Sequence, residues 1–238
     1  MRARVLPRLD NLMSVPERTI VVGDIHGCLG KLEEMMKRLD PKPGRDHLVF
    51  LGDYVDRGEN SRGVIEYLLR LREEHPETIF LMGNHETMFL DFLAGEEQAL
   101  FIHNGGGSTI RSYMGRMENP RLVMSRGLDA SVLEQMVPAG HRGFLGDLRL
   151  HYETPEFIMV HAGLRDGIPL EKQTADDLVW IREEFIYSEQ DFGKRVIFGH
   201  TPFVRPLVLP NKIGIDTGAV YGNALTSIIL PDLEFISV

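Results

Sequence analysis

Residues 19–27 read TIVVGDIHG, an apolar and β-branched run that ends at a glycine and is followed at once by polar residues. The same arrangement returns at residues 47–58, HLVFLGDYVDRG, and at residues 78–86, TIFLMGNHE. Short apolar runs of this composition are typical of buried strands. The sequence therefore predicts three strands, at residues 19–22, 47–51 and 78–82.

Helix-like segments separate these three runs. Both spacers carry apolar residues at steps of three and four, which predicts amphipathic helices. Strands about 30 residues apart with a helix between them predict right-handed crossovers and a parallel sheet. The polar residues then meet at the carboxyl ends of the strands, where such sheets bind ligands. The apolar positions are Leu29, Leu32, Met36 and Leu39 in the first spacer, and Val64, Ile65, Leu68 and Leu71 in the second.

The rest of the chain changes character. Residues 86–145 are mostly helix-like, with an interruption at the NGGG of residues 104–107. Closely spaced strand-like runs follow, and they predict a second sheet packed on the first. No repeat or linker divides the chain, so we expect one α/β domain over residues 1–238, with residues 1–18 as a surface lead-in. The later runs are residues 157–160, 196–198, 213–215, 225–230 and 234–238.

Composition excludes several classes of function. The 238 residues carry a formal net charge of −9, which argues against a broad nucleic-acid surface. The lone Cys28 cannot form an internal disulfide, and no apolar run approaches the roughly 18 residues of a membrane span. We therefore expect a cytoplasmic protein that binds neither nucleic acid nor membrane. Composition does not indicate an oligomeric state.

The polar residues after the strands are of the types that bind hard metal ions. In an extended segment Asp24 and His26 point the same way and can bind one ion. Asp53 has two carboxylate oxygens and can bridge two ions. The same alternation predicts that Asn84 faces the ions while His85 faces away and is free for proton transfer.

Other residues complete this constellation. Asp56 and Arg57 lie just beyond Asp53, where one can orient a histidine and the other can hold phosphate oxygens. His161 and His200 each follow a later strand, and we expect both to be metal ligands. The NGGG segment has two interpretations, a phosphate-cradling loop or a break in a helix. The remaining histidines lie outside any constellation: His47, His75, His103, His141 and His151.

The motifs GDIHG, GDYVDRG, GNHE, HAG and GHTP, in this order, resemble the phosphoprotein phosphatase family of calcineurin-like metallophosphoesterases. Within that family the WIRE of residues 180–183, the NGGG, and residues 198–207 and 215–223 (FGHTPFVRPL and IDTGAVYGN) are most similar to the bacterial and lambda-phage serine/threonine protein phosphatases. The resemblance covers roughly residues 19–230. It implies two packed mixed β-sheets flanked by helices, with a dimetal site at the carboxyl ends of the strands.

The resemblance also implies roles for individual residues. One metal is held by Asp24, His26 and Asp53, and the other by Asp53, Asn84, His161 and His200. Arg57 and Arg182 hold phosphate, His85 oriented by Asp56 protonates the leaving group, and Tyr221 lies near the substrate, although the Cys that usually follows it is Gly222 here. A ligand set of oxygen and nitrogen without thiolate favours two Mn²⁺ ions, with iron or Zn²⁺ as alternatives.

Three functions stay open at this point. The first is direct attack of a metal-bridging hydroxide on a phosphorylated protein, peptide or small phosphoester. The second is hydrolysis of diadenosine tetraphosphate, performed by a sister branch that usually lacks the acidic partner in the second motif and has GNHD in the third. Asp56 and Glu86 favour the first. The third is a non-catalytic metal-stabilised scaffold, and Arg182 has its own alternative, an ion pair with Glu183 or Asp177 on a helix surface.

Overall fold

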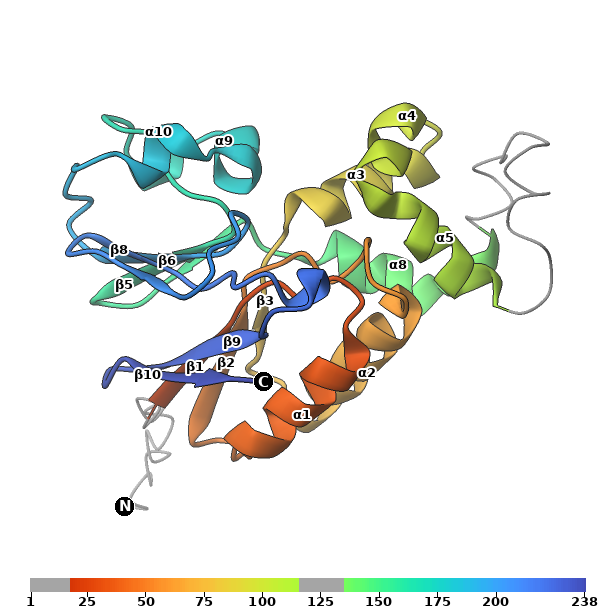
Figure 1. The fold of residues 1–238 in the computed structure, drawn as a ribbon, viewed down its shortest axis with the longest axis horizontal. Helices are drawn as coiled ribbons and strands as arrows, with labels where there is room; N and C mark the ends of the chain where they lie inside the picture. Colours follow the sequence, from red (N-terminus) through yellow and green to blue (C-terminus); the bar gives the residue numbers. More distant parts are fainter. Residues whose placement is uncertain (1–17, 116–134) are drawn as a thin grey trace, which may run out of the picture.

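The computed structural model describes residues 18–115 and 135–238, which form two five-stranded sheets with helices on their outer faces (Figure 1). The first sheet has the order β10-β9-β1-β2-β3 and the second the order β4-β5-β6-β8-β7. The strands are β1 (Arg18–Val22), β2 (Asp46–Phe50), β3 (Ile79–Phe80), β4 (His151–Glu153), β5 (Phe157–Val160), β6 (Arg195–Phe198), β7 (Leu207–Val208), β8 (Lys212–Gly214), β9 (Thr226–Leu230) and β10 (Glu234–Ser237). Of the lead-in expected over residues 1–18, Arg18 belongs to β1 and the rest lies outside the described residues.

The predicted parallel unit is confirmed, since β1 pairs with β2 and β2 with β3 in parallel. The prediction that all later strands form the second sheet was wrong for two of them. Strand β9 pairs antiparallel with β1, with Val21 opposite Ile228, and β10 pairs with β9. Periodicity shows that a segment is a strand but not which sheet edge it joins, and here the free edge of β1 takes the final hairpin. The edge strands β4 and β7, of three and two residues, were too short to predict.

The side chains of the central strands alternate between two cores. In β1, Ile20 and Val22 face the helices while Val21 faces the second sheet. From the second sheet, Met159 and Ile197 enter the same inter-sheet core, and their neighbours pack under the helices on the far side. Burial on both faces explains why these strands read as continuous apolar runs. The result is four layers, helices, sheet, sheet and helices (Figure 1).

The helices form where the apolar spacing predicted them. The first two cover the outer face of the first sheet, and α2 begins after Asn60, whose side chain accepts a hydrogen bond from the Gly63 N–H. Residues 86–145 are largely helical as expected in their described part; residues 116–134 lie outside it. No helix in the described ranges is long and apolar enough to cross a membrane. The helices are α1 (Leu29–Leu39), α2 (Ser61–Glu74), α3 (Asn84–Leu93), α4 (Gln98–Phe101), the π-helical η1 (Ile102–Gly106), α5 (Gly107–Met114), α8 (Ala139–Gly146), η2 (Leu170–Lys172), α9 (Ala175–Trp180), α10 (Glu183–Ile186) and η3 (Ala219–Tyr221).

Candidate metal centre and catalytic site

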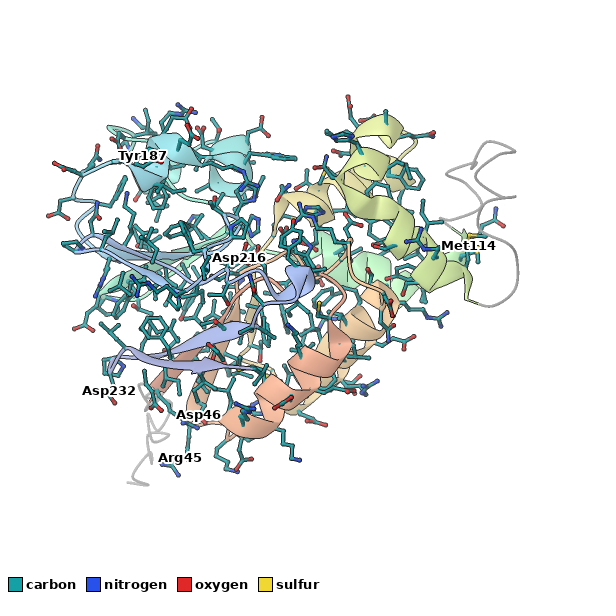
Figure 2. All side chains as sticks on the ribbon, viewed as in Figure 1. Arg45, Asp46, Met114, Tyr187, Asp216 and Asp232 are labelled. Atoms are coloured by element: carbon teal, nitrogen blue, oxygen red, sulfur yellow. The ribbon has the colours of Figure 1, made fainter. Side chains whose placement is uncertain are left out.

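The predicted site residues meet where strands of both sheets end. Three of these strands belong to the first sheet and two to the second, so the site lies at the junction of the sheets. Figure 2 labels Asp216, which lies at this junction near the centre of the view. Asp24 and His26 follow β1, Asp53 follows β2, Asn84 and His85 open α3 after β3, His161 follows β5 and His200 follows β6.

Backbone carbonyls orient three of the site histidines. A carbonyl oxygen only accepts hydrogen bonds, so the ring nitrogen facing it carries the proton and the other nitrogen has a free lone pair. Burial also keeps two of the rings neutral, lowering the pKa of His161 to about 4 and that of His200 to about 2, whereas the Asp53 carboxylate outweighs burial at His26 and raises its pKa. The contacts are His26 Nδ1 to Val55 O at 2.8 Å, His161 Nδ1 to Leu51 O at 2.9 Å and His200 Nε2 to Trp180 O at 3.2 Å.

The free nitrogens gather around Asp53, one carboxylate oxygen to each side. Its Oδ2 lies 3.3 Å from His26 Nε2 and its Oδ1 lies 3.3 Å from His161 Nε2. His161 Nε2 is also 3.2 Å from His200 Nδ1 and 3.2 Å from Asn84 Oδ1. Asp53 thus faces two separate groups of donor atoms, as a bridging ligand must. Neither group includes any of the five histidines expected to lie outside the site.

Asp24 supplies an independent sign that cations belong here. Its Oδ2 accepts a hydrogen bond from the His200 N–H at 2.9 Å, whereas its Oδ1 is buried and has no hydrogen-bond partner among the described residues. Burial, together with the nearby Asp216 and Asp53 carboxylates, raises the pKa of Asp24 well above its usual range. A Cβ at Gly199 would collide with Oδ1, so only glycine admits the carboxylate here. The residues present therefore fit divalent metal ions, which take carboxylate, amide and imidazole ligands.

His85 forms a buried pair with Asp56. The His85 Nδ1 lies 2.7 Å from Asp56 Oδ2, and the His85 Nε2 is buried with no hydrogen-bond partner in the part of the chain that the structure describes. Burial raises the pKa of Asp56 to about 7 and lowers that of His85 to about 3. Below neutral pH one proton is therefore shared by the carboxyl and imidazole groups. Such a pair can deliver a proton at His85 Nε2.

The prediction that Asn84 and His85 alternate on opposite faces of an extended segment was wrong, although both residues lie at the site. Asn84 and His85 are the first residues of α3, so they are separated by about 100° of rotation instead of lying on opposite faces of a strand. His85 consequently does not face away: a nitrogen of its ring lies within 4.8 Å of ligand atoms of His26 and Asp53. His26 also departs from extended geometry, with φ of 46°.

Backbone strain is concentrated at the site. Of the eight non-glycine residues with positive φ in the described ranges, five are predicted site residues. Left-handed conformations of this kind cost on the order of 1–3 kcal/mol each and persist where the surrounding contacts impose them. Each re-aims a side chain that an ordinary strand or turn would point elsewhere. The five are His26 (46°), Asp53 (52°), Asp56 (69°), Arg57 (66°) and His200 (63°).

Both predicted arginines reach the site from opposite sides. Arg57 Nη1 lies 2.6 Å from His26 Nε2, and its guanidinium lies 5.7 Å from the ring centroid of Tyr221, which is 60% exposed. Arg182 Nη1 donates to His200 O at 3.1 Å and is half-buried. Burial lowers the Arg182 pKa. The Asp53 carboxylate acts against this shift, and the Arg57 charge adds to it. The alternative of a surface ion pair with Glu183 or Asp177 was wrong, because within the described ranges Arg182 pairs with neither acid and Asp177 pairs with Arg165.

Glu86 has a structural role that the sequence did not predict. It is fully buried, and its carboxylate accepts hydrogen bonds from four backbone N–H groups. Three belong to the loop that carries Asp53, so Glu86 holds that loop against α3. Its place in the GNHE motif was the only signal. The donors are Asp53 (2.8 Å), Tyr54 (2.8 Å), Val55 (3.2 Å) and Gly83 (3.0 Å).

Comparison with known proteins agrees with this geometry. Serine/threonine-protein phosphatase 1 of Salmonella typhimurium is 31% identical over 210 residues, covering 87% of this chain and 88% of the relative. Bis(5'-nucleosyl)-tetraphosphatase PrpE of Oceanobacillus iheyensis is 28% identical over 240 residues, covering 92% and 90%. A cold-active protein-tyrosine phosphatase of a Shewanella species shares the fold, with a TM-score of 0.67 and 17% identity over 94% of this chain and 78% of that one. The model of the calcineurin-like phosphoesterases matches residues 17–216, and the chain therefore belongs to this family of metal-dependent phosphoesterases.

Proposed function

We propose that this chain is a phosphomonoesterase of the serine/threonine protein phosphatase type. The observation that carries the proposal is the Asp56–His85 pair, with its 2.7 Å contact and the unpartnered Nε2. The alkoxide of serine or threonine is a strong base and leaves only with a proton, which such a pair can supply. A nucleotide released from a polyphosphate is a much weaker base and needs that proton less.

In this proposal Asp24, His26 and Asp53 would hold one divalent ion, and Asp53 would also serve a second. The donor atoms gathered around Asp53 and the unpaired Asp24 Oδ1 support this set. The oxygen and nitrogen donors suit Mn²⁺. When bound, the ions supply charge for the phosphoryl oxygens and lower the pKa of water. The remaining ligands of the second ion are Asn84, His161 and His200.

The side chains around these ligands bind and orient the phosphoester. Arg57 and Arg182 reach the site from different loops, and two guanidinium groups can hold the equatorial oxygens of a phosphoryl group. His85 Nε2 donates the proton to the departing oxygen. Asp56 keeps the ring in place, and the proton that the pair shares passes from its carboxyl group to Nδ1 as Nε2 gives up its own.

The second candidate function is hydrolysis of a dinucleoside polyphosphate, as the name of the PrpE relative indicates. One feature of this chain favours it. Tyr221 presents an exposed ring beside Arg57, and an exposed aromatic face can stack on a nucleobase. Under this alternative, Tyr221→Ala lowers hydrolysis of diadenosine tetraphosphate and leaves small phosphomonoesters unaffected.

A substrate panel separates the two candidates. Metal-reconstituted protein is compared on phosphoserine, phosphothreonine and phosphotyrosine peptides and on diadenosine tetraphosphate, with kcat/KM measured for each. We expect the phosphoserine and phosphothreonine peptides to be turned over fastest. A preference for diadenosine tetraphosphate by an order of magnitude or more overturns the proposal in favour of the second candidate, and inactivity on every ester supports the scaffold.

A further inference from the structure

A buried network of hydroxyl groups lies behind the Asp56–His85 pair. Thr109 Oγ1, in α5, donates to Asp56 Oδ1 at 2.6 Å and accepts from the Asp56 backbone N–H at 2.8 Å. Ser61, at the start of α2, lies 2.9 Å from the same Thr109 oxygen and also accepts from the Asp56 N–H at 3.1 Å. Thr109 and Ser61 are both fully buried.

The directions of these bonds follow from counting hydrogens. A hydroxyl group has one hydrogen, and that of Thr109 is used on Asp56 Oδ1. Ser61 must therefore donate to Thr109 while accepting from the Asp56 backbone. Each polar atom in the network has a partner, so the arrangement allows one orientation of the Asp56 carboxylate.

We propose that Thr109 is a positioning residue for the proton donor. It holds Asp56 Oδ1, which leaves Oδ2 as the oxygen that contacts His85 and aims the ring at the leaving group. The inference rests on the proposed role of His85 as the acid. The Asp56 backbone is in the left-handed region, with φ of 69°, and its N–H is held by the same two hydroxyl groups.

The segment that delivers Thr109 contains the NGGG of residues 104–107. The helix-break interpretation holds, because Gly105, inside the π-helical η1 and two residues before α5, has a non-helical φ of 103°. The Gly105 carbonyl accepts from the Arg57 N–H at 3.2 Å, and a Cβ on Gly105 would approach Arg57 Cγ to 2.9 Å. The break therefore lets α5 lie directly against the Asp56–Arg57 loop, where Thr109 can reach the carboxylate.

The experiment compares three variants with the wild-type protein. Thr109→Val keeps the shape and removes both hydrogen bonds to Asp56 together with the one from Ser61, and Thr109→Ser keeps the hydroxyl. Thr78→Val is the matched control, because Thr78 is also buried but bonds the His75 carbonyl, before β3. Rates are measured on a phosphoserine peptide and on p-nitrophenyl phosphate, whose leaving group is a weak base.

We expect T109V to lose about 10- to 100-fold in kcat on the phosphoserine peptide, the usual cost of removing a residue that orients a functional group. The loss on p-nitrophenyl phosphate should be several-fold smaller, with KM and metal content unchanged. T109S should recover most of the rate, and T78V should match wild type. Equal losses on both esters, or no recovery in T109S, would overturn the proposal.

A second measurement keeps the test independent of the substrate. Proton NMR detects the His85 Nδ1–H engaged with Asp56 as a downfield resonance, whichever ester the enzyme prefers. The resonance should shift or disappear in T109V and persist in T109S. If it is unchanged in folded T109V, Thr109 does not position the pair, whereas wild-type inactivity on the phosphoserine peptide with the NMR result intact counts against the proposed function alone.

Discussion

The two sheets contribute differently to the candidate site. Loops after the first sheet supply the carboxylates, Asn84 and the Asp56–His85 pair, whereas the second sheet supplies His161 and His200 and holds Arg182 beside them. The candidate oxygen ligands thus come from the side of the first sheet, whereas two of the three candidate imidazole ligands come from the side of the second. The donor sets are complete only when the sheets are packed together. We therefore expect metal binding to depend on the packing between the two sheets. The predictions below test how the site is divided between them.

The largest expected effect is at Asp53, which contacts histidines from both sheets. Asp53→Asn removes a bridging charge, so we expect hydrolysis to be abolished while the fold survives. Turnover of p-nitrophenyl phosphate with added Mn²⁺ measures the loss, and circular dichroism checks the fold. Asp232→Asn, an exposed change between β9 and β10, is the control. Near-normal turnover in D53N would show that the two donor groups do not share a bridge.

The next effect concerns His85, which belongs to the first-sheet side. His85→Asn should lose about 10²- to 10⁴-fold on alkyl phosphates, the range for general acid catalysis. Aryl phosphates should suffer less, because their leaving groups are weaker bases. Two metal ions per chain should remain, measured by metal analysis, with His47→Asn at the other end of β2 as control. Loss of one ion would reassign His85 as a ligand.

The two arginines test whether both sides bind the phosphoryl group. Hydrogen bonds that strengthen in the transition state are worth roughly 3–4 kcal/mol, so Arg57→Ala and Arg182→Ala should each lower kcat/KM by about 10²- to 10³-fold. Lysine should restore only part of the loss, because it lacks the planar fork. Arg165→Ala, which breaks an exposed pair with Asp177, is the control. Wild-type kinetics in R182A would confine substrate binding to the first-sheet side.

Removing the metal ions tests whether they link the two sheets, because a link would raise the thermal stability of the folded chain. An ion at 100 times its Kd stabilises the folded chain by about 2.7 kcal/mol per site, which for a chain of this size raises Tm by about 5–10 °C. Chelation should reverse that gain, and D53N should show little gain to reverse. Differential scanning calorimetry provides the measurement. A Tm that does not change when the chelator is added would mean that the ions do not join the sheets.

The smallest effect lies at the opposite end of the first sheet, where Figure 2 shows Asp46 far from Asp216. Arg18 binds the Asp46 carboxylate through two nitrogens at 2.7 and 2.8 Å, which lowers the Asp46 pKa. The lowered pKa contributes stability above pH 4 that disappears as the pH falls through the folded-state value. Because Arg18 is partly exposed, Asp46→Asn should cost less than about 1 kcal/mol at pH 7 and still less near pH 3, with activity unchanged. A difference that grows in acid would contradict this sign.

Much of the site could be predicted because each motif directly follows a strand. Asp24, Asp53 and Asn84 stand at the ends of three parallel strands, so the topology alone brings them to one edge. Other features had no local signal. The left-handed backbone of His26 and Asp53 is imposed by tertiary contacts, and neither residue type requires it. The bond from Thr109 to Asp56 spans 53 positions, and sequence periodicity cannot orient the helices that lie between them.

The sequence by itself determined the residue types, their order, and the three parallel strands that bring them to one edge, because apolar periodicity and glycine placement are local properties. Only the tertiary structure decided which sheet receives the final hairpin, where Arg182 lies, and which ring nitrogen each histidine leaves free. These depend on contacts between segments distant in the chain. The Leu51 carbonyl that orients His161, for example, is 110 residues away and meets it only when the two sheets pack.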